Sequence, residues 1–160
     1  MNLFVLDNDF DKCAEYHVDR HVGKMLLEAT QLLCTTFHIN GVTAPYKPSH
    51  NNHPCAVFTR ESKENFDWVI QYAFALAKEF IYRYDKVHKS SEVLGWCMKN
   101  KHLLTFPKQS LTPFALAMPD QYKTNDPVES YRNYYFFGKG HLAAWKGRAI
   151  PFWYNDKYFI

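Results

Sequence analysis

Apolar residues recur at steps of three and four along two long stretches of the chain, residues 11–38 and 54–88. In the first stretch they are Ala14, Val18, Val22, Met25, Leu26, Ala29, Leu32 and Leu33. In the second they are Phe58, Phe66, Val69, Ala73, Leu76, Phe80 and Tyr84, and Ser62 occupies one position of the same helical step. This spacing places each set on one face of a helix. The sequence therefore predicts two long amphipathic helices, and the second, kinked near Ser62, forms the spine of the fold.

Shorter elements complete a mainly α expectation. The apolar run "LFVL" near the N-terminus predicts a buried strand or an extended segment packed under the helices. Further helices are expected over residues 91–103 and 127–138, the latter opened by a proline and ended by Gly138. A long loop rich in Pro and Asn covers residues 40–54, and residues 145–160 form an aromatic tail without periodicity. We expect a compact, single-domain helical fold over residues 1–160, with a short N-terminal extended segment and an irregular aromatic C-terminal tail.

Composition places the chain among ordinary globular proteins. Its 160 residues suffice for one core, and 47% apolar with 22% charged residues is close to average. A net charge of +3 permits an anionic partner such as nucleic acid without requiring one. The start, "MNLFVLDND", lacks the pattern of a secretory signal, and no apolar run is long enough to span a membrane. Four scattered cysteines without a CxxC pair then indicate reduced thiols in a cytoplasmic protein.

The stretch "DRHVGKMLLE", residues 19–28, is unusual for a buried helix. On a helical wheel His17, His21, Lys24 and Glu28 form one row at the margin of the apolar stripe, where a helix meets a cleft. The row is either a solvated edge or one wall of a catalytic site. As a solvated edge, Lys24 and Glu28 would form a surface ion pair worth about 0.3 kcal/mol. Lysine before glutamate is the less favourable order, so helix stabilisation explains the row poorly.

The same stretch carries a resemblance to a known family. Asp19-x-His21, followed seven residues after the histidine by Glu28, resembles the first helix of pyrimidine-dimer DNA glycosylases of the phage endonuclease V type. "NNHPCAVFTR" is similar to the Asn-His-Pro segment that leads into a long helix in bacterial relatives. "YYFFGKG" and "WKGRAIPFWY" resemble the C-terminal aromatic and Gly-Lys segment of the family. The resemblance is specific around residues 19–28 and 52–60 and covers much of the remaining chain in outline.

This resemblance implies a compact, mostly α enzyme of DNA repair or base modification. Such a glycosylase flips a nucleotide out of the duplex, and an amine then attacks the sugar C1′. The base leaves, an imine forms, and β-elimination can cut the strand (AP lyase activity). The implied partner is DNA or a nucleotide, no cofactor is implied, and Glu28 matches the position of the catalytic carboxylate.

Two amines are candidates for the nucleophile. An α-amino group has a pKa near 8, against about 10.4 for a lysine side chain, so a chain terminus is a ready amine at neutral pH. The family exposes that amine by removing the initiator Met, which needs a small second residue. Asn2 is not small, so we expect Met1 to be retained and its amine to serve if the N-terminal segment ends beside Glu28. Lys24 is the alternative, and it would have to be deprotonated through burial or through cations such as His21. Without either amine, the protein would use Glu28 to activate water as a monofunctional glycosidase, or it would act on a free nucleotide.

Several other residues are candidates for contacts to the substrate. In the long loop, Asn52 and His53 are expected either to read a base edge or phosphate or to cap the following helix. Aromatic and basic residues alternate in the C-terminal third, a mixture that suits base stacking as well as a core. The full set of substrate-binding candidates is His17, Arg20, Asn52, His53, Arg60, Tyr134, Lys139 and Trp145.

Two other classes of protein remain open. A metal-dependent hydrolase or nuclease would use His17 and His21 at helical spacing together with His53, with His50 or Cys55 as further ligands. No dense ligand motif such as HExxH is present. A non-catalytic nucleic-acid-binding module would instead act through the aromatic tail, and its function would not depend on Glu28.

Overall fold

Helices make up the regular structure of the computed structural model, which describes residues 1–156. Within that range the α-helices are α1 Phe10–Tyr16, α2 Asp19–Ile39, α3 Pro54–Glu61, α4 Lys63–Tyr84, α5 Ser90–Asn100, α6 Pro127–Asn133 and α7 Phe152–Asp156. Short turns of other helix types cover Lys101–Leu103, Asp120–Tyr122, Tyr134–Gly138 and Gly140–Leu142. No strand forms within residues 1–156, where the only β-type pairing is an isolated bridge between Ser62 and Lys108. The expected mainly α fold is confirmed.

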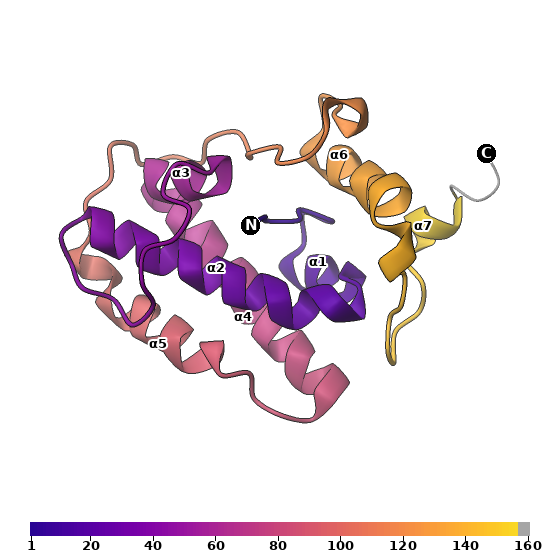
Figure 1. The fold of residues 1–160 in the computed structure, drawn as a ribbon, viewed down its shortest axis with the longest axis horizontal. Helices are drawn as coiled ribbons and strands as arrows, with labels where there is room; N and C mark the ends of the chain where they lie inside the picture. Colours follow the sequence, from indigo (N-terminus) through magenta and orange to yellow (C-terminus); the bar gives the residue numbers. More distant parts are fainter. Residues whose placement is uncertain (157–160) are drawn as a thin grey trace.

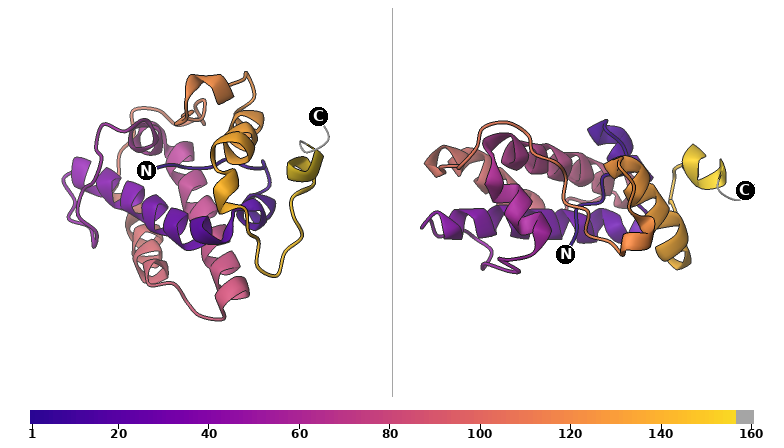
Figure 2. Two further views of the ribbon diagram at one scale, coloured as in Figure 1. Left: turned by 45° about the vertical axis from the view of Figure 1, so that its right-hand side comes forward. Right: turned by 90° about the horizontal axis from the view of Figure 1, so that it is seen from above.

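The two long helices form the centre of the molecule. α2 and α4 pack against each other, α5 packs on both of them, and α1 packs on α4 (Figure 1). The segment from α6 to α7 lies at one end of the molecule in all three views (Figures 1 and 2). The N-terminus lies in the middle of the fold beside α2, between α3 and α6 (Figure 1). This central position of the chain end determines where the candidate site forms.

The prediction of one continuous helix over residues 11–38 is wrong, because the chain breaks between α1 and α2. Val18 has extended backbone angles, φ −63° and ψ 155°. The guanidinium of Arg83, from α4, lies at the break and donates to the carbonyls of Glu15 and His17 and to the carboxylate of Asp19. These carbonyls would accept hydrogen bonds inside a continuous helix. Arg83 replaces those donors and thereby stabilises the interruption.

The second long stretch breaks where the sequence predicted a kink. Ser62 is buried and extended, with φ −145° and ψ 158°, and its hydroxyl accepts a hydrogen bond from the N–H of Asn65. The stretch is therefore two helices, α3 and α4, rather than one. α4 ends before residue 88 as well, because Asp85 takes a left-handed conformation with φ 51°.

The remaining helix predictions agree closely with the structure. α5 and the turn after it span residues 90–103, and α6 with its π-helical extension runs from Pro127 to Gly138. The tail is irregular except for α7, which begins after Pro151, the carbonyl of which accepts the N–H of Tyr154. Residues 157–160 of the predicted tail lie outside the described residues.

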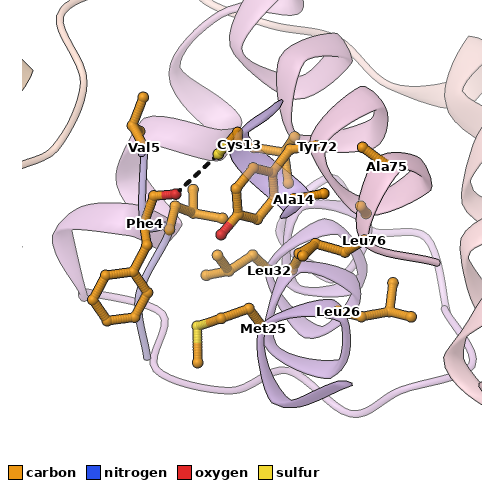
Figure 3. Packing of buried hydrophobic residues seen from close by; sticks show 14 of the residues in the cluster. Phe4, Val5, Cys13, Ala14, Met25, Leu26, Leu32, Tyr72, Ala75 and Leu76 are labelled. Carbon is orange, nitrogen blue, oxygen red and sulfur yellow. Dashed lines mark hydrogen bonds between the residues drawn. The ribbon is translucent and has the colours of Figure 1, made fainter. Parts of the chain in front are cut away.

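The extended N-terminal segment is part of the core. Phe4 and Val5 are buried, and Figure 3 draws them in one cluster of buried residues with Tyr72 of α4 and Leu32 of α2. The thiol of Cys13 donates to the carbonyl of Phe4 at 3.3 Å. The alternative of a buried extended segment, rather than a strand in a sheet, is therefore the correct one for the described chain.

All four cysteines are free and buried, as expected for reduced thiols. Sγ of Cys34 lies 3.9 Å from Sγ of Cys97. Burial raises the pKa of the Cys13 and Cys55 thiols to about 12, which keeps both protonated at neutral pH. Within residues 1–156 no helix is both long enough and apolar enough to cross a membrane.

Arg83→Met should lower the free energy of unfolding by about 3–5 kcal/mol, because it leaves the buried Glu79 carboxylate and two backbone carbonyls with fewer donors. Urea denaturation measures the change. The matched control is Lys78→Met, which removes only an exposed ion pair with Asp11 and should cost less than about 1 kcal/mol. Equal losses in the two variants would show that the helix break does not depend on Arg83.

Candidate active site

The N-terminal amine lies beside the candidate carboxylate. The nitrogen of Met1 is 3.5 Å from Oε1 of Glu28, and the Glu28 side chain is only 13% exposed. Glu28 lies near the middle of α2, at the point where the N-terminus approaches that helix (Figure 1). This is the arrangement that the hypothesis of a Met1 nucleophile requires.

The side chain of Asn2 fixes the chain end in this position. Its Oδ1 accepts the N–H of Leu3 at 2.8 Å and lies 3.1 Å from the hydroxyl of Tyr131, which donates to it. Its amide group donates to the carbonyl of Ala117 at 2.8 Å. Asn2 is 8% exposed, so these hydrogen bonds are shielded from water. The residue that predicts retention of Met1 also holds the Met1 amine in place.

A pocket of about 370 Å³ surrounds the amine and the carboxylate. A volume of this size falls in the range of small-molecule sites. The wall of the pocket comes from four parts of the chain: the N-terminal segment, α2, the start of α3, and the region from residue 116 to 139. The lining residues are Met1, Asn2, Phe4, His21, Lys24, Met25, Glu28, His53, Pro54, Leu116, Ala117, Met118, Tyr134 and Lys139.

Charge in the pocket is unevenly balanced. Glu28 is the one carboxylate in the lining, against the Met1 amine and two lysines, Lys24 and Lys139. Neither lysine forms an ion pair with a carboxylate within residues 1–156. Oε2 of Glu28 is buried and has no hydrogen-bond partner among the described residues. A buried carboxylate oxygen without a donor is costly, so the pocket favours a ligand that brings a donor to Glu28 and negative charge to the lysines.

His21 is a neutral member of the pocket. Its Nδ1 lies 2.7 Å from the hydroxyl of Tyr135, and its ring stacks on Phe4 with centroids 4.8 Å apart. Burial, and then the charges of Lys139 and Lys24, lower the pKa of His21 to about 4. The imidazole is therefore uncharged at neutral pH, and it cannot supply the positive charge that a Lys24 nucleophile would need nearby.

His53 combines two roles that the sequence left open. Its Nδ1 accepts the N–H of Cys55 at 3.0 Å, which caps the start of α3. The same side chain lines the pocket. Burial, and then the positive charge of the Met1 amine, lower the pKa of His53, although Glu28 acts in the opposite direction. The cap is thereby kept in the neutral form that accepts a hydrogen bond.

His17 lies outside the pocket, because the helix break removes it from the row that contains His21, Lys24 and Glu28. It is fully buried, with Nδ1 2.7 Å from the carbonyl of Cys13 and Nε2 2.9 Å from the hydroxyl of Tyr72. The prediction that His17 contacts a substrate directly has no geometric support.

His17 is for the same reason not available as a ligand in the proposed metal site. Both ring nitrogens of His17 already have partners, and both His21 and His53 use Nδ1 within the protein. Within residues 1–156, no three side chains of the His, Cys, Asp and Glu types are grouped so that they could hold a metal ion.

Four further substrate-binding candidates are also outside the pocket. Arg20 and Asn52 are exposed on other parts of the surface. The guanidinium of Arg60 donates to the carbonyl of Asn51 at 2.6 Å and lines a different surface hollow. Trp145 is buried, and its indole N–H donates to the carbonyl of residue 16.

The aromatic C-terminal third is mostly core. Tyr131, Tyr135 and Trp153 are at most 4% exposed, so their rings are not available for base stacking. From the mixture of aromatic and basic residues, only Tyr134 and Lys139 line the pocket, with Nζ of Lys139 5.2 Å from the ring centroid of Tyr134. Phe137 and Phe152, by contrast, are 64% and 61% exposed, so a nucleic-acid-binding module that uses this region would have to stack bases on these rings.

Sequence reasoning missed several residues that shape the pocket. Phe4 and Tyr135 hold His21, and residues 116–118 form an apolar wall opposite α2. The apolar run "FALAM" between two prolines is a signal for a buried segment, but nothing in it indicates which part of the fold it covers.

Stability should fall as the pH drops below neutrality, because the pKa of His17 is lowered from its ordinary 6.5 to about 3 by burial. Between these pH values the imidazole of His17 is protonated in the unfolded chain and neutral in the folded chain. The free energy of unfolding therefore decreases toward acid by up to about 1.4 kcal/mol per pH unit. His17→Asn should reduce the slope between about pH 6 and about pH 4 in urea denaturation, while the lowered pKa of His21 continues to contribute to it. His102→Asn, at an exposed position, should leave the slope unchanged. Parallel curves for the wild type and the His17 variant would contradict this prediction.

Comparison with known proteins adds no relative to this picture. The sequence matches no protein-family model, and it has no match among curated proteins or among solved structures. What the pocket does has to be inferred from its own side chains.

Proposed function

We propose that the chain is an enzyme of the N-glycosylase type, which cleaves the bond between a base and its sugar with the Met1 amine as nucleophile and Glu28 as the catalytic carboxylate. The observation that carries the proposal is the 3.5 Å distance between the Met1 nitrogen and Oε1 of Glu28 within a pocket. A nucleoside unit flipped out of a DNA strand is the proposed substrate.

The residue types suit each step of this reaction. Glu28 takes a proton from the Met1 ammonium, and the free amine attacks C1′ of the sugar. The C1′–N bond breaks, and its electron pair leaves with the base, which takes up the proton that the attacking nitrogen releases. The sugar ring then opens, with Glu28 returning its proton to the ring oxygen, and an imine joins Met1 to C1′. Loss of a C2′ proton then breaks the C3′–O bond by β-elimination, so the imine supplies the lyase step.

Lys24 is a weaker candidate for the nucleophile. Its side chain is exposed and lines the pocket without an ion pair to Glu28. The Met1 amine is held beside the carboxylate by the hydrogen bonds of Asn2. We therefore assign the attack to Met1 and a contact to the substrate to Lys24.

Borohydride reduction in the presence of an abasic-site oligonucleotide should trap a covalent adduct at Met1. The imine of the proposed reaction becomes a stable amine on reduction, and mass spectrometry of peptides locates it. An adduct on Lys24 would reassign the nucleophile. Base release without any adduct would show that water attacks, and silence on abasic, UV-damaged and modified-base strands would overturn the proposal.

Glu28→Gln should lower the rate of base release or of adduct formation by at least about 100-fold, because it removes the proton acceptor but keeps the shape of the side chain. Binding of the same oligonucleotide should be retained. Glu92→Gln on the exposed face of α5 is the matched control and should keep the wild-type rate. A fully active Glu28 variant would remove the carboxylate from the mechanism.

One additional residue in front of Met1 gives an independent test of the amine. The extension moves the terminal nitrogen away from Glu28, so trapping at the chain end should disappear while the fold is preserved. Intact mass of the wild-type protein shows whether Met1 is retained, and the same trapping assay compares the two proteins. Undiminished trapping of the extended chain would exclude the Met1 amine.

A further inference from the structure

The hydrogen bonds around Tyr135 determine which nitrogen of His21 carries a hydrogen. The hydroxyl oxygen of Tyr135 lies 3.2 Å from the backbone nitrogen of Val18 and 2.7 Å from Nδ1 of His21. A backbone N–H can only donate, so this oxygen accepts from Val18. The hydroxyl hydrogen of Tyr135 is then free to be donated to His21, and Nδ1 accepts it.

The opposite arrangement leaves a buried donor unsatisfied. If Nδ1 of His21 carried the hydrogen, two N–H groups would point at the oxygen of Tyr135. The hydroxyl hydrogen of Tyr135, a residue 1% exposed, would then have no acceptor among the described residues. Such a group costs about 1–3 kcal/mol. His21 is therefore the tautomer with its hydrogen on Nε2.

The ring is also held in a fixed orientation. Phe4 stacks on one face with an interplanar angle of 19°, and the bond to Tyr135 prevents rotation of the ring. Because the lowered pKa of His21 keeps the ring neutral, the Nε2 hydrogen is its one hydrogen-bond donor. Within residues 1–156 Nε2 has no partner, and His21 lines the pocket.

Two lysines share the pocket with this donor. Lys24 and Lys139 line the same pocket, and each lies near enough to His21 that its charge contributes to the lowered pKa of the imidazole. Neither has a carboxylate partner in the described chain. His21, Lys24 and Lys139 thus present donors and no acceptor, whereas Glu28 on the same helix is engaged with the Met1 amine.

We propose that Nε2–H of His21 and the ammonium groups of Lys24 and Lys139 form a phosphate subsite next to the pair of Met1 and Glu28. The ligand is a phosphoester group. Its oxygens accept hydrogen bonds, and their negative charge would pair with the ammonium groups of the two lysines. Its role in turnover rests on the proposed function, since the subsite would hold the phosphate next to the sugar under attack. Binding of phosphate itself does not depend on turnover.

Long-range proton–nitrogen NMR spectra of the histidine side chains test the tautomer directly. His17 is an internal control with the opposite assignment, because its Nδ1 faces the carbonyl of Cys13 and must donate, whereas Nε2 faces the hydroxyl of Tyr72. At neutral pH we expect His17 with hydrogen on Nδ1 and His21 with hydrogen on Nε2. A charged His21, or hydrogen on its Nδ1, would overturn the proposal.

Titration with inorganic phosphate in the same spectra tests the subsite. The Nε2 signal of His21 should shift and saturate, and the double variant Lys24→Gln, Lys139→Gln should weaken binding by at least about tenfold. Lys99→Gln on α5, an exposed lysine outside the pocket, is the control and should not change it. An unshifted His21 signal, or equal affinity in the double variant, would refute the subsite.

Two variants of His21 distinguish the role of its hydrogen-bond donor from that of the bulk of its side chain. His21→Gln keeps an amide donor near the position of Nε2 and should retain most of the phosphate affinity, whereas His21→Leu should lose it. Equal affinity in these two variants would contradict the assigned donor. Circular dichroism confirms that each variant is folded, and the glutamine variant alone remains informative if the leucine variant is not.

Two further measurements determine which kind of phosphate ester binds and whether the subsite and the proposed reaction stand or fail separately. Deoxyribose 5-phosphate offers a phosphate monoester, and a dinucleotide offers a phosphodiester. Tighter binding of one than of free deoxyribose supports the subsite and identifies its ester, whereas equal binding of all three refutes it. If the His21 and lysine variants still form the trapped adduct and their affinity for phosphate is unchanged, the subsite is refuted and the proposed reaction is not. Phosphate binding without trapping would refute the proposed reaction and leave the subsite in place.

Discussion

The buried guanidinium of Arg83 is the interaction on which the arrangement of the helices depends. It lies where α1 ends and α2 begins, and it bonds Glu79 on its own helix as well as two carbonyls and a carboxylate across the break. The carboxylate of Glu79 also accepts a hydrogen bond at 2.8 Å from the guanidinium of Arg148, in the C-terminal segment. One buried ionic group therefore joins the first two helices, the central helix and the tail. Its position sets where α2 starts, and hence which of its side chains face the N-terminus.

The extended N-terminal segment is fixed without a sheet. Its backbone groups are buried and need partners, which a neighbouring strand would normally provide. Here side chains supply them: Cys13 donates to the carbonyl of Phe4, Arg132 donates to the carbonyl of Leu6, and Asn2 of the segment itself accepts the N–H of Leu3. Each of these bonds restrains the segment at a different point. The amine at its end is consequently held beside Glu28.

Helical periodicity was sufficient to predict most of the fold, and one wall of the candidate site. His21, Lys24 and Glu28 share a face of α2 because their spacing matches the helix repeat, and the structure places all three in the pocket. The break before α2 could not be predicted, because Val18 suits a helix locally and the cause of the break lies 65 residues further on, at Arg83. The same limitation moved His17 from the expected row into the core. Periodicity describes one element at a time, so it cannot identify partners such as Tyr135 that reach the site from another part of the chain.

The four-part wall of the pocket has a consequence for the order in which the pocket forms. Residues 1–4, α2, the start of α3 and residues 116–139 meet only when the last third of the chain has docked on the central helices. Contacts between such distant positions form late when a chain folds, because loop-closure entropy opposes them. A nascent or partly folded chain would therefore carry the complete row on α2 but no enclosed amine. The Met1 amine and Glu28 are therefore enclosed together only in the last steps of folding.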